Sequence, residues 1–548
     1  MTSSTVEYPR SPYGEKDIET TTGLRLHPGE LRLAVLIAVV IVAVSCLPYL
    51  IGYLAKMQQG MQGQWTATLL YTPEDHPALI LYVFYLALGH LAAWLNLPSI
   101  LVYHIARVAC GLILLISLYL FLSLFLEPLQ TRRVAYLLAA TGSGVGWLAA
   151  VIVASPALKS VSPIDFWLME AYVFFTLFLF PHSTLAMALL LGALGGTVVY
   201  FRRGSAWRPW LLVLGCGLAL ALINPYVLVV AGTILAGYWL AIWIARRRLP
   251  WREALALAAL GALLALPMAY YALQFNSHPV WRSFLAQDVV PSPPVWYYMM
   301  GYGLIFLLAL PGAWIVLKGQ DEPQLLLVAW PAIILLAVYV PLAGQRRMIF
   351  GAIIPLSALA ACGLLGAVLP AVRQSRLGGW LSARGYSRER LGGVVVALTI
   401  ALASISNLFL VASSTWSAAI GHPLITQPVA VEDAIAWLGA HSASDAVILS
   451  SYRVGNVIPA RIGRRVVWGH WDETAFYDEK EADVTLFFDG ATPDAERRSI
   501  LRRYGVNYVL YGPAERELGS FRPIAAPYLR AVFEADEVSV YQVDVGIQ

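Results

Sequence analysis

The sequence predicts a polytopic α-helical membrane protein of about eleven spanning helices with a small α/β domain at its C-terminus. Hydrophobic residues make up 59% of the 548 residues and charged residues only 13%, about half the charged fraction typical of soluble domains. Apolar runs of membrane-spanning length follow one another over residues 31–413, and the chain becomes polar after Trp416. A chain of this composition is not a water-soluble globule.

The spans are predicted from length, because a helix needs about 20 apolar residues to cross the hydrocarbon core of a bilayer. The first run is longer than the core of a signal peptide and no small-residue cleavage pattern follows it, so we expect a retained anchor. Residues 1–30 are polar, and we expect a disordered cytoplasmic tail there. The predicted spans cover residues 31–54, 99–126, 134–154, 183–201, 209–224, 226–245, 252–271, 296–318, 323–342, 348–370 and 391–413.

Basic residues between the runs predict the orientation in a bacterial cytoplasmic membrane. Cytoplasmic loops are enriched in Lys and Arg, and with the N-terminus in the cytoplasm the five clusters named at the end of this paragraph all fall on that side. Residues 78–96 are long enough to cross the membrane, but a crossing there would move every later loop to the opposite side. We therefore expect a helix that lies in the outer interface or re-enters it. The clusters are Arg132–Arg133, Arg202–Arg203 with Arg208, Arg246–Arg248 with Arg252, Lys318, and Arg373–Arg390.

Four pieces of the chain are then expected on the outer face, namely 55–98, 155–182, 272–294 and 414–548. Outer loops of this size carry function more often than stability. The last piece is predicted to be a soluble α/β domain, because short apolar strands alternate with helical patterns. The strands are predicted at 446–451, 465–469, 507–512, 530–535 and 537–543, and the helices at 429–441, 473–488 and 493–504.

Charge and cysteine usage exclude several classes of function. The net charge of +4 is small for this length and the basic residues form short clusters, so no nucleic-acid partner is expected. The C-terminal domain lacks the glycine-rich loops of nucleotide-binding proteins. The cysteines lie inside apolar runs and predict neither a disulfide framework nor a metal cluster. They are Cys46, Cys110, Cys216 and Cys362.

Gln345-Arg346-Arg347 lies between two apolar runs on the predicted outer face, where basic residues are otherwise scarce. The guanidinium fork offers paired donors that match phosphate oxygens. We therefore interpret Arg346 and Arg347 as candidates for binding a phosphate or pyrophosphate headgroup. The alternative is that both side chains reach ordinary anionic lipid headgroups at the membrane surface.

The segment YTPEDHP, from Tyr71 to Pro77, is the second candidate site. Asp75, with Glu74 as second choice, could serve as a general base or bind a metal ion, and His76 could pair with a phosphate or shuttle a proton. Pro77 is favoured at the start of a helix, so Asp75 could equally be an N-cap. Adjacent side chains point in different directions, so Glu74 and Asp75 are not expected to form one paired site.

Other polar residues lie near the outer ends of predicted spans, where such groups are costly and therefore functional candidates. For His182, which follows Pro181 at a helix break, a structural bond to a freed carbonyl is the preferred interpretation. The sequence GHWDET, Gly469–Thr474, could contact an acceptor substrate or dock the C-terminal domain on the membrane helices, and docking is preferred. The remaining candidates are Asp165, Glu170, Asn224 and Asp288.

Several of these motifs resemble a known family. His76-Pro77 and Arg107 match a pattern of the glycosyltransferase C superfamily, which includes protein O-mannosyltransferases and aminoarabinose transferases, although the second proline of the pattern is Ala78 here. The chain is more similar still to uncharacterised bacterial members with a C-terminal α/β domain. The motifs that carry this likeness are Tyr71–Glu74, Leu88–His90, Gln345–Arg347, Ile354–Leu356, Gly455–Ala460, Gly469–Thr474 and Tyr504–Pro513.

The resemblance implies an enzyme of the cell envelope that moves a sugar from a polyprenyl-phosphate donor to an acceptor on the outer face of the membrane. It also implies an acidic base soon after the first span, often with a divalent metal such as Mg or Mn. The sequence departs from the family here, because residues 47–65 contain no Asp or Glu. Either Glu74 or Asp75 has taken this role, or the chain has lost the chemistry.

The preferred hypothesis is an inverting glycosyltransferase in which Asp75, or else Glu74, is the base and candidate metal ligand. Arg346, Arg347 and His76 would bind the donor phosphate and stabilise it as it leaves. The alternative is a catalytically inactive membrane scaffold or lipid-handling protein that retains the fold. A secondary transporter fits less well, because the sequence shows no pair of similar halves.

Overall fold

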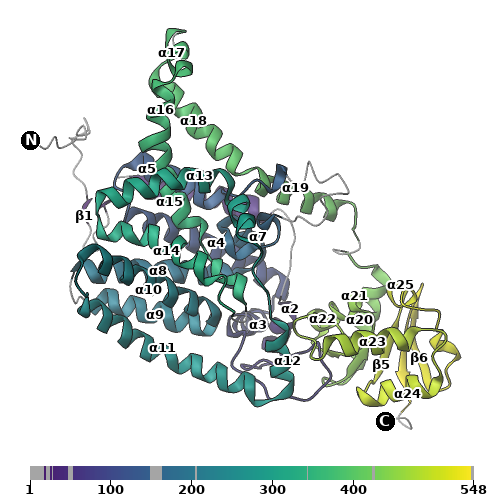
Figure 1. The fold of residues 1–548 in the computed structure, drawn as a ribbon. Helices are drawn as coiled ribbons and strands as arrows, with labels where there is room; N and C mark the ends of the chain where they lie inside the picture. Colours follow the sequence, from purple (N-terminus) through teal and green to yellow (C-terminus); the bar gives the residue numbers. More distant parts are fainter. Residues whose placement is uncertain are drawn as a thin grey trace, which may run out of the picture.

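The computed structural model describes residues 18–19, 25–26, 29–46, 53–148, 163–203, 207–341, 344–384, 386–422 and 426–544. A large bundle of helices carries a smaller mixed domain, drawn in yellow, beside α2, α3 and α12 (Figure 1). The disordered tail expected over residues 1–30 lies almost wholly outside the described residues, as do 47–52 and 149–154 of two predicted spans.

Six helices of the described chain are long and apolar enough to cross a membrane. A seventh span results if α18 (Arg388–Ala403) and α19 (Ile405–Ala419), bent by 44° at their junction, are counted together. The predicted class of polytopic helical membrane protein is confirmed. The six are α4 (Ser99–Ser123), α8 (Pro181–Arg203), α10 (Pro225–Arg246), α11 (Trp251–Ser277), α13 (Val295–Gly319) and the segment Gln345–Gln374, which contains α15 (Ile353–Gly363) and α16 (Leu369–Gln374).

The other four predicted spans also form helices, but shorter ones. They are α1 (Glu30–Ser45), α5 (Leu129–Thr141), α9 (Trp207–Ile223) and α14 (Leu325–Ala337). The doubtful segment 78–96 contains α3 (Val83–Leu95), whose 13 residues would extend about 20 Å, less than the thickness of the hydrocarbon core. This length agrees with a helix that does not cross, as the basic clusters predict.

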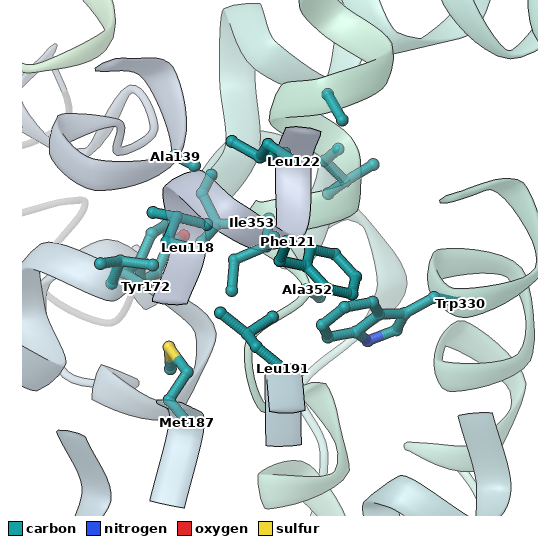
Figure 2. Packing of buried hydrophobic residues seen from close by; sticks show 14 of the residues in the cluster. Leu118, Phe121, Leu122, Ala139, Tyr172, Met187, Leu191, Trp330, Ala352 and Ile353 are labelled. Atoms are coloured by element: carbon teal, nitrogen blue, oxygen red, sulfur yellow. The ribbon is translucent and has the colours of Figure 1, made fainter. Parts of the chain in front are cut away.

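The core of the bundle is a single large cluster of buried apolar side chains from many helices. Figure 2 shows Phe121 of α4 beside Trp330 of α14, with Leu191 of α8 below them. Backbones approach closely where glycines face a neighbouring helix: a Cβ at Gly312 of α13 would lie 1.8 Å from the Leu359 carbonyl oxygen of α15. Glycine is therefore required for this helix pair to pack as it does.

The C-terminal domain holds a five-stranded sheet in the order β4-β3-β5-β7-β6. Strands β3, β4 and β5 are parallel, while β7 is antiparallel to both β5 and β6. Each predicted strand is confirmed. The central strands β3 and β5 are short, continuous apolar runs that are largely buried, as expected for strands covered on both faces, whereas the edge strand β6 is mostly exposed or half-buried. The strands are β3 (Val447–Leu449), β4 (Arg465–Val466), β5 (Tyr508–Tyr511), β6 (Leu529–Ala535) and β7 (Val538–Val543).

Helices cover the two faces of this sheet. Ile448 points to the face covered by α20 (Val429–His441), whereas Val447 and Leu449 pack with α23 (Tyr477–Phe488) and α24 (Asp494–Arg503) on the other. The three helices match the predicted ones, except that α23 begins at Tyr477 rather than 473. The residues before it form a turn that contacts the membrane bundle.

The loop after the first span joins the two parts of the molecule. In α2 (Leu54–Met61), Lys56 Nζ lies 2.6 Å from Glu473 Oε2, and Gln58 Nε2 donates to the Ala460 carbonyl at 3.3 Å. The Val466 N–H of β4 donates to the Leu70 carbonyl at 3.0 Å. Segments predicted to share the outer face thus meet at one junction.

Candidate functional site

Arg347 lies in a short 3-10 helix, Gln345–Ile349, that begins after Gly344. Gly344 has a φ of 69°, in the left-handed region that favours glycine, and its carbonyl accepts a hydrogen bond from the Tyr226 hydroxyl at 2.7 Å. The Arg347 guanidinium donates through Nη1 to Asp288 Oδ2 at 2.9 Å, and its Nη2 lies 2.8 Å from Asp288 Oδ1. Only the Nη1–Oδ2 contact has hydrogen-bond geometry, but both oxygens of the carboxylate lie against the guanidinium as an ion pair.

A second acid flanks the same guanidinium. Glu170 Oε1 lies 3.6 Å from Arg347 Nε, and the Glu170 carbonyl accepts the Gly351 N–H at 2.8 Å. Burial raises the pKa of the Glu170 and Asp288 carboxyls above their ordinary values, while the positive charge of Arg347 opposes that shift. The structure therefore brings three sequence candidates, from three segments predicted to lie on the outer face, into one charged cluster.

Arg346 is held differently from its neighbour. Its guanidinium lies 5.0 Å from the centre of the Trp167 ring, and its backbone N–H donates to the Val290 carbonyl at 3.2 Å. Cation–π attraction holds a guanidinium by its face and leaves the N–H donors at its edge able to bind an anion. The two arginines thus share a backbone segment, but Arg346 lies against Trp167 whereas Arg347 forms the ion pairs with Asp288 and Glu170.

His182, in the first turn of α8, belongs to an aromatic group. Its Nδ1 lies 2.7 Å from the Tyr85 hydroxyl, and Tyr53 stacks on Tyr85 with ring centroids 4.7 Å apart. Tyr53 and His182 also make an edge contact at 5.0 Å, and both lie within electrostatic range of Arg347. Tyr53 comes from the segment 47–65 that lacks an acid, so this segment presents an aromatic ring near the charged cluster.

The C-terminal domain reaches the same place through the turn His470–Thr474. The turn is closed by backbone N–H groups of Glu473 and Thr474 that donate to the His470 carbonyl at 3.0 and 2.8 Å. Gln287, the last residue of α12 (Pro279–Gln287), fastens the turn to the membrane bundle. Its Nε2 donates at 3.0, 3.2 and 3.0 Å to the carbonyls of Trp471, Asp472 and Thr474.

Asp472 is brought close to the charged cluster by these bonds, because Asp288 directly follows Gln287. The Asp472 carboxylate lies within electrostatic range of Asp288 and Arg347. Burial, together with the negative charges of Asp288 and Glu473, raises the pKa of Asp472 to about 6. A fourth acidic side chain, from a different domain, therefore contributes to the electrostatics of this cluster.

Two further candidates from the sequence, Asp165 and Asn224, interact with the backbone. Asp165 is buried, and its Oδ2 accepts the backbone N–H groups of Gly144 and Gly146 at 3.1 and 3.0 Å. It therefore anchors the chain that follows α5. Asn224 lies at the break between α9 and α10, where its carbonyl accepts the Val227 N–H at 3.0 Å.

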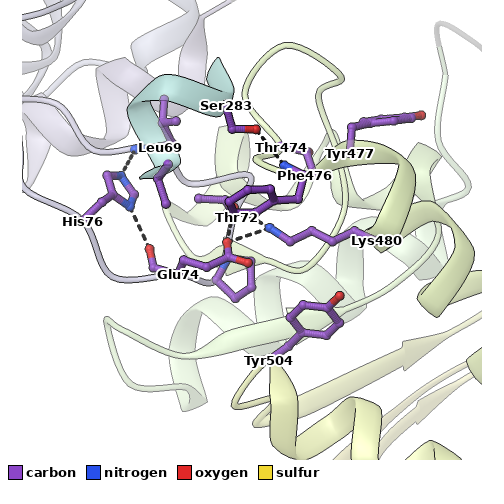
Figure 3. A network of polar contacts seen from close by, with 12 residues as sticks. Leu69, Thr72, Glu74, His76, Ser283, Thr474, Phe476, Tyr477, Lys480 and Tyr504 are labelled. Atoms are coloured by element: carbon purple, nitrogen blue, oxygen red, sulfur yellow. Dashed lines mark hydrogen bonds and ion pairs between the residues drawn. The ribbon is translucent and has the colours of Figure 1, made fainter. Parts of the chain in front are cut away.

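The segment YTPEDHP packs against the C-terminal domain (Figure 3). Glu74 Oε2 lies 2.6 Å from the buried Lys480 Nζ and also accepts the Thr72 hydroxyl. Asp75 pairs with Arg465 at 2.7 Å, and its side chain is 95% exposed. Glu74 and Asp75, the acids predicted as base and metal ligand, are thus paired with cations of the C-terminal domain. The acids paired with Arg347 are instead Asp288 and Glu170.

His76 helps to shape this segment. Its Nε2 accepts the Leu69 N–H at 2.9 Å, which leaves Nδ1 to donate to the Glu74 carbonyl at 2.7 Å (Figure 3). The ring also makes an edge contact with Trp281, and burial lowers the pKa of His76. Both ring nitrogens are therefore used in holding the loop.

Known structures share this architecture. ArnT from Cupriavidus metallidurans, solved with undecaprenyl phosphate, superposes with a TM-score of 0.57 over 95% of this chain and 99% of that chain, at 14% identity. The Archaeoglobus fulgidus oligosaccharyltransferase AglB, solved with an inhibitory peptide and a dolichol-phosphate, gives 0.51 over 88% and 69%, at 15% identity. The mycobacterial arabinofuranosyltransferase AftD gives 0.53 over 95% of this chain but only 40% of that chain, at 13% identity.

These likenesses are in the fold. No protein-family model and no curated protein sequence matches the chain. The chain shares the fold of these transferase structures, in agreement with the fold that the resemblance of its motifs implies. At these identities the likeness establishes the architecture alone, and the chemistry has to be argued from the residues of this chain.

The resemblance also implies a divalent metal, and the donor set can be compared with that expectation. An oligosaccharyltransferase structure from Archaeoglobus fulgidus contains Zn and sulfate. In the described part of this chain, no three His, Cys, Asp or Glu side chains lie close enough together to hold a metal ion. The side chains of the described residues therefore do not form a site that fits Mg or Mn.

Sequence reasoning identified most members of the charged cluster without showing that they meet. Arg347, Asp288 and Glu170 were each singled out by their place at the end of a span. Asp472 was noted only as part of a docking or acceptor-contact motif, and Tyr53 was missed. The available sequence signal for Asp472 was an acid that follows His470 and Trp471 in a polar loop.

Proposed function

We propose that this protein is a membrane glycosyltransferase that transfers a sugar from a polyprenyl-phosphate donor to an acceptor at the outer face of the membrane. The observation that carries the proposal is the Arg347 cluster, placed where the outer segments and the C-terminal domain meet. The fold shared with ArnT, AglB and AftD supports the same donor class, because solved members hold undecaprenyl phosphate or a dolichol-phosphate.

The donor phosphate would bind to Arg347 and Arg346. Arg347 already lies against both oxygens of the Asp288 carboxylate, and Arg346 has edge donors beside Trp167. The paired donors of a guanidinium suit phosphate oxygens as well. On transfer, the bond from the anomeric carbon to the phosphate oxygen breaks and negative charge develops on the leaving phosphate. Fixed positive charge at that point stabilises the transition state more than the ground state.

The acids beside Arg347 would hold its side chain in place. Asp288 and Glu170 approach the guanidinium from two sides, so its plane is fixed before the donor arrives. Because these charges are already in place, the site does not reorganise during the reaction. This preorganisation is the main source of electrostatic catalysis. Ion pairs with Asp288 and Glu170 also offset the cost of placing the cation near the membrane.

The orientation proposed from the basic clusters puts this junction outside the cytoplasm. Arg246 pairs with both Glu253 and Glu322, at 2.6 and 2.8 Å, so the cytoplasmic ends expected for α10, α11 and α14 lie together. The C-terminal domain, α2 and α12 then belong to the outer face of a bacterial cytoplasmic membrane. Labelling of single cysteines in intact cells would check this side assignment.

Binding of undecaprenyl phosphate to the purified full-length protein tests the proposal. Arg347→Gln is expected to weaken this binding at least tenfold, while the control Arg453→Gln, which breaks a surface pair with Glu517, leaves it unchanged. Should Arg347→Gln unfold the protein, Arg346→Gln, which loses only a stacked side chain, carries the same expectation. Unchanged binding in both arginine variants would overturn the assignment.

A turnover measurement distinguishes a glycosyltransferase from the alternative, a catalytically inactive membrane scaffold or lipid-handling protein. Wild-type protein is expected to release undecaprenyl phosphate from at least one of a panel of undecaprenyl-phosphate-linked pentoses and hexoses, incubated with a cell-envelope fraction as acceptor source. Binding without release from any donor would instead favour a lipid-handling protein. The inactive alternative has to be tested because residues 53–65 contain no acid.

A further inference from the structure

The turn His470–Thr474 is fixed from two sides of the junction. Glu473 forms a buried ion pair with Lys56 of α2, and Gln287 of α12 binds three of the turn's carbonyls. Within the turn, the Thr474 hydroxyl accepts the Gly469 N–H at 3.1 Å. The position of the residue between these anchors, Asp472, is therefore set by the membrane helices as much as by its own domain.

The other acids at this junction have strong cationic partners. Asp288 and Glu170 pair with Arg347, Glu473 with Lys56, and Glu74 with Lys480. Asp472 differs, because among the described residues no ion pair joins it to a cation, and its Oδ1 atom is buried without a hydrogen-bond partner. The Oδ1 atom of Asp288 also has no hydrogen bond, but it lies 2.8 Å from Arg347 Nη2. A buried carboxylate oxygen without a partner is costly, and a catalytic role is one explanation for such a group in a native protein.

We propose that Asp472 is the base that deprotonates the acceptor hydroxyl, so that the C-terminal domain completes the active site. This inference rests on the proposed function. The acceptor O–H proton moves to the Asp472 carboxylate as the acceptor oxygen forms a bond to the anomeric carbon of the sugar. The bond from that carbon to the phosphate oxygen breaks, and its electron pair leaves with the phosphate held by Arg347.

The arrangement also explains the sequence departure from the family. Residues 53–65 supply Tyr53 and Lys56 but no acid, and Lys56 binds the turn that carries Asp472. The loop after the first span would thus position an acid that it does not contain. Loss of an acid in one segment and delivery of another from a separate domain leave the chemistry intact.

The charges around Asp472 suit a base. Burial is the largest cause of its raised pKa of about 6, and the charges of Asp288 and Glu473 act in the same direction. Arg347 and His470 act in the opposite direction and keep the carboxylate ionised at neutral pH. A base whose pKa lies just below the working pH is ionised yet more basic than an ordinary aspartate.

The variant Asp472→Asn keeps the size of the side chain and removes the base. Release of undecaprenyl phosphate from the donor that wild type turns over is expected to fall at least 100-fold in kcat, within the range typical of a lost general base. Binding of undecaprenyl phosphate and the thermal unfolding midpoint are expected to stay unchanged. Asp478→Asn, at an exposed position six residues later, is the matched control and should keep the wild-type rate.

The pH profile distinguishes a base from a structural residue. Wild-type kcat/KM is expected to fall tenfold per pH unit below about pH 6, and Asp472→Asn to lose that dependence. Asp472→Glu should recover part of the rate with the dependence restored. An Asp472→Asn rate within threefold of wild type overturns the inference alone, whereas failure of wild type to turn over any donor overturns the proposed function.

Discussion

Lys56 and Glu473 form a buried ion pair across 417 residues of sequence, with Nζ and Oε2 2.6 Å apart and side chains only 1% and 6% exposed. Lys56 belongs to the loop after the first span, and Glu473 belongs to the turn that carries Asp472. The Lys56 ammonium also donates to the Thr68 carbonyl at 3.2 Å and lies 4.8 Å from the Tyr82 ring centre. This pair therefore couples the docking of the C-terminal domain to the placement of the proposed base.

Lys56→Met is expected to destabilise the docked domain by about 3 kcal/mol, because it leaves the Glu473 carboxylate buried without a partner. Thermal unfolding in detergent and the rate of proteolysis between the two parts measure the effect. Arg453→Met, which breaks an exposed pair, should cost less than about 1 kcal/mol. The double variant Lys56→Met/Glu473→Gln should recover part of the loss, and no recovery would contradict the pairwise explanation.

Glu74 and Asp75 are adjacent acids, but replacing them is expected to change stability to different extents. Asp75→Asn should change stability by less than about 1 kcal/mol, because its pair with Arg465 is exposed to solvent. Glu74→Gln should cost about 3 kcal/mol, because it leaves the Lys480 ammonium buried without its counter-charge. Unfolding midpoints and kcat are measured on both variants. A 100-fold loss of kcat in Asp75→Asn at unchanged stability would return the role of base to Asp75 and contradict the assignment to Asp472.

Lys480 should make the folding stability of the protein vary with pH in the alkaline range. Burial lowers the pKa of Lys480 to about 8 in the folded protein, against 10.5 for a free side chain. Between these values the unfolded state binds more protons than the folded state, so stability rises with pH across this window. Relative to Lys480→Met, the wild type should gain about 2 kcal/mol between pH ~7.5 and ~9.5. A difference that is flat or falls with pH would contradict this environment for the lysine.

Gly89 of α3 allows close contact with α2. A Cβ at this position would lie 2.2 Å from the Met57 carbonyl oxygen, so Gly89→Ala should lower stability by about 2 kcal/mol through overpacking. Gly261→Ala in α11 is the control, because nothing lies within 4 Å of the added carbon. The unfolding midpoint should fall for the first variant and hold or rise slightly for the second. Equal midpoints would contradict the α2–α3 contact.

The sequence by itself determined the class of the molecule, the apolar segments and the strands of the C-terminal domain. These features depend on local patterns, such as the length of an apolar run or the alternation of side chains in a strand. The sequence also singled out Arg347 as a candidate, because the orientation expected from the basic clusters places this arginine on the outer face.

Only the tertiary structure decided which charges meet. Arg347 pairs with Asp288 and Glu170, which come from other segments, and Asp472 joins them from another domain. Asp75 was the preferred base from sequence, yet its partner is Arg465, 390 residues away. The physical reason is that ion pairing depends on distance and burial, which are set by how helices and loops pack. A local pattern records that a side chain is charged, but not which opposite charge the fold brings to it.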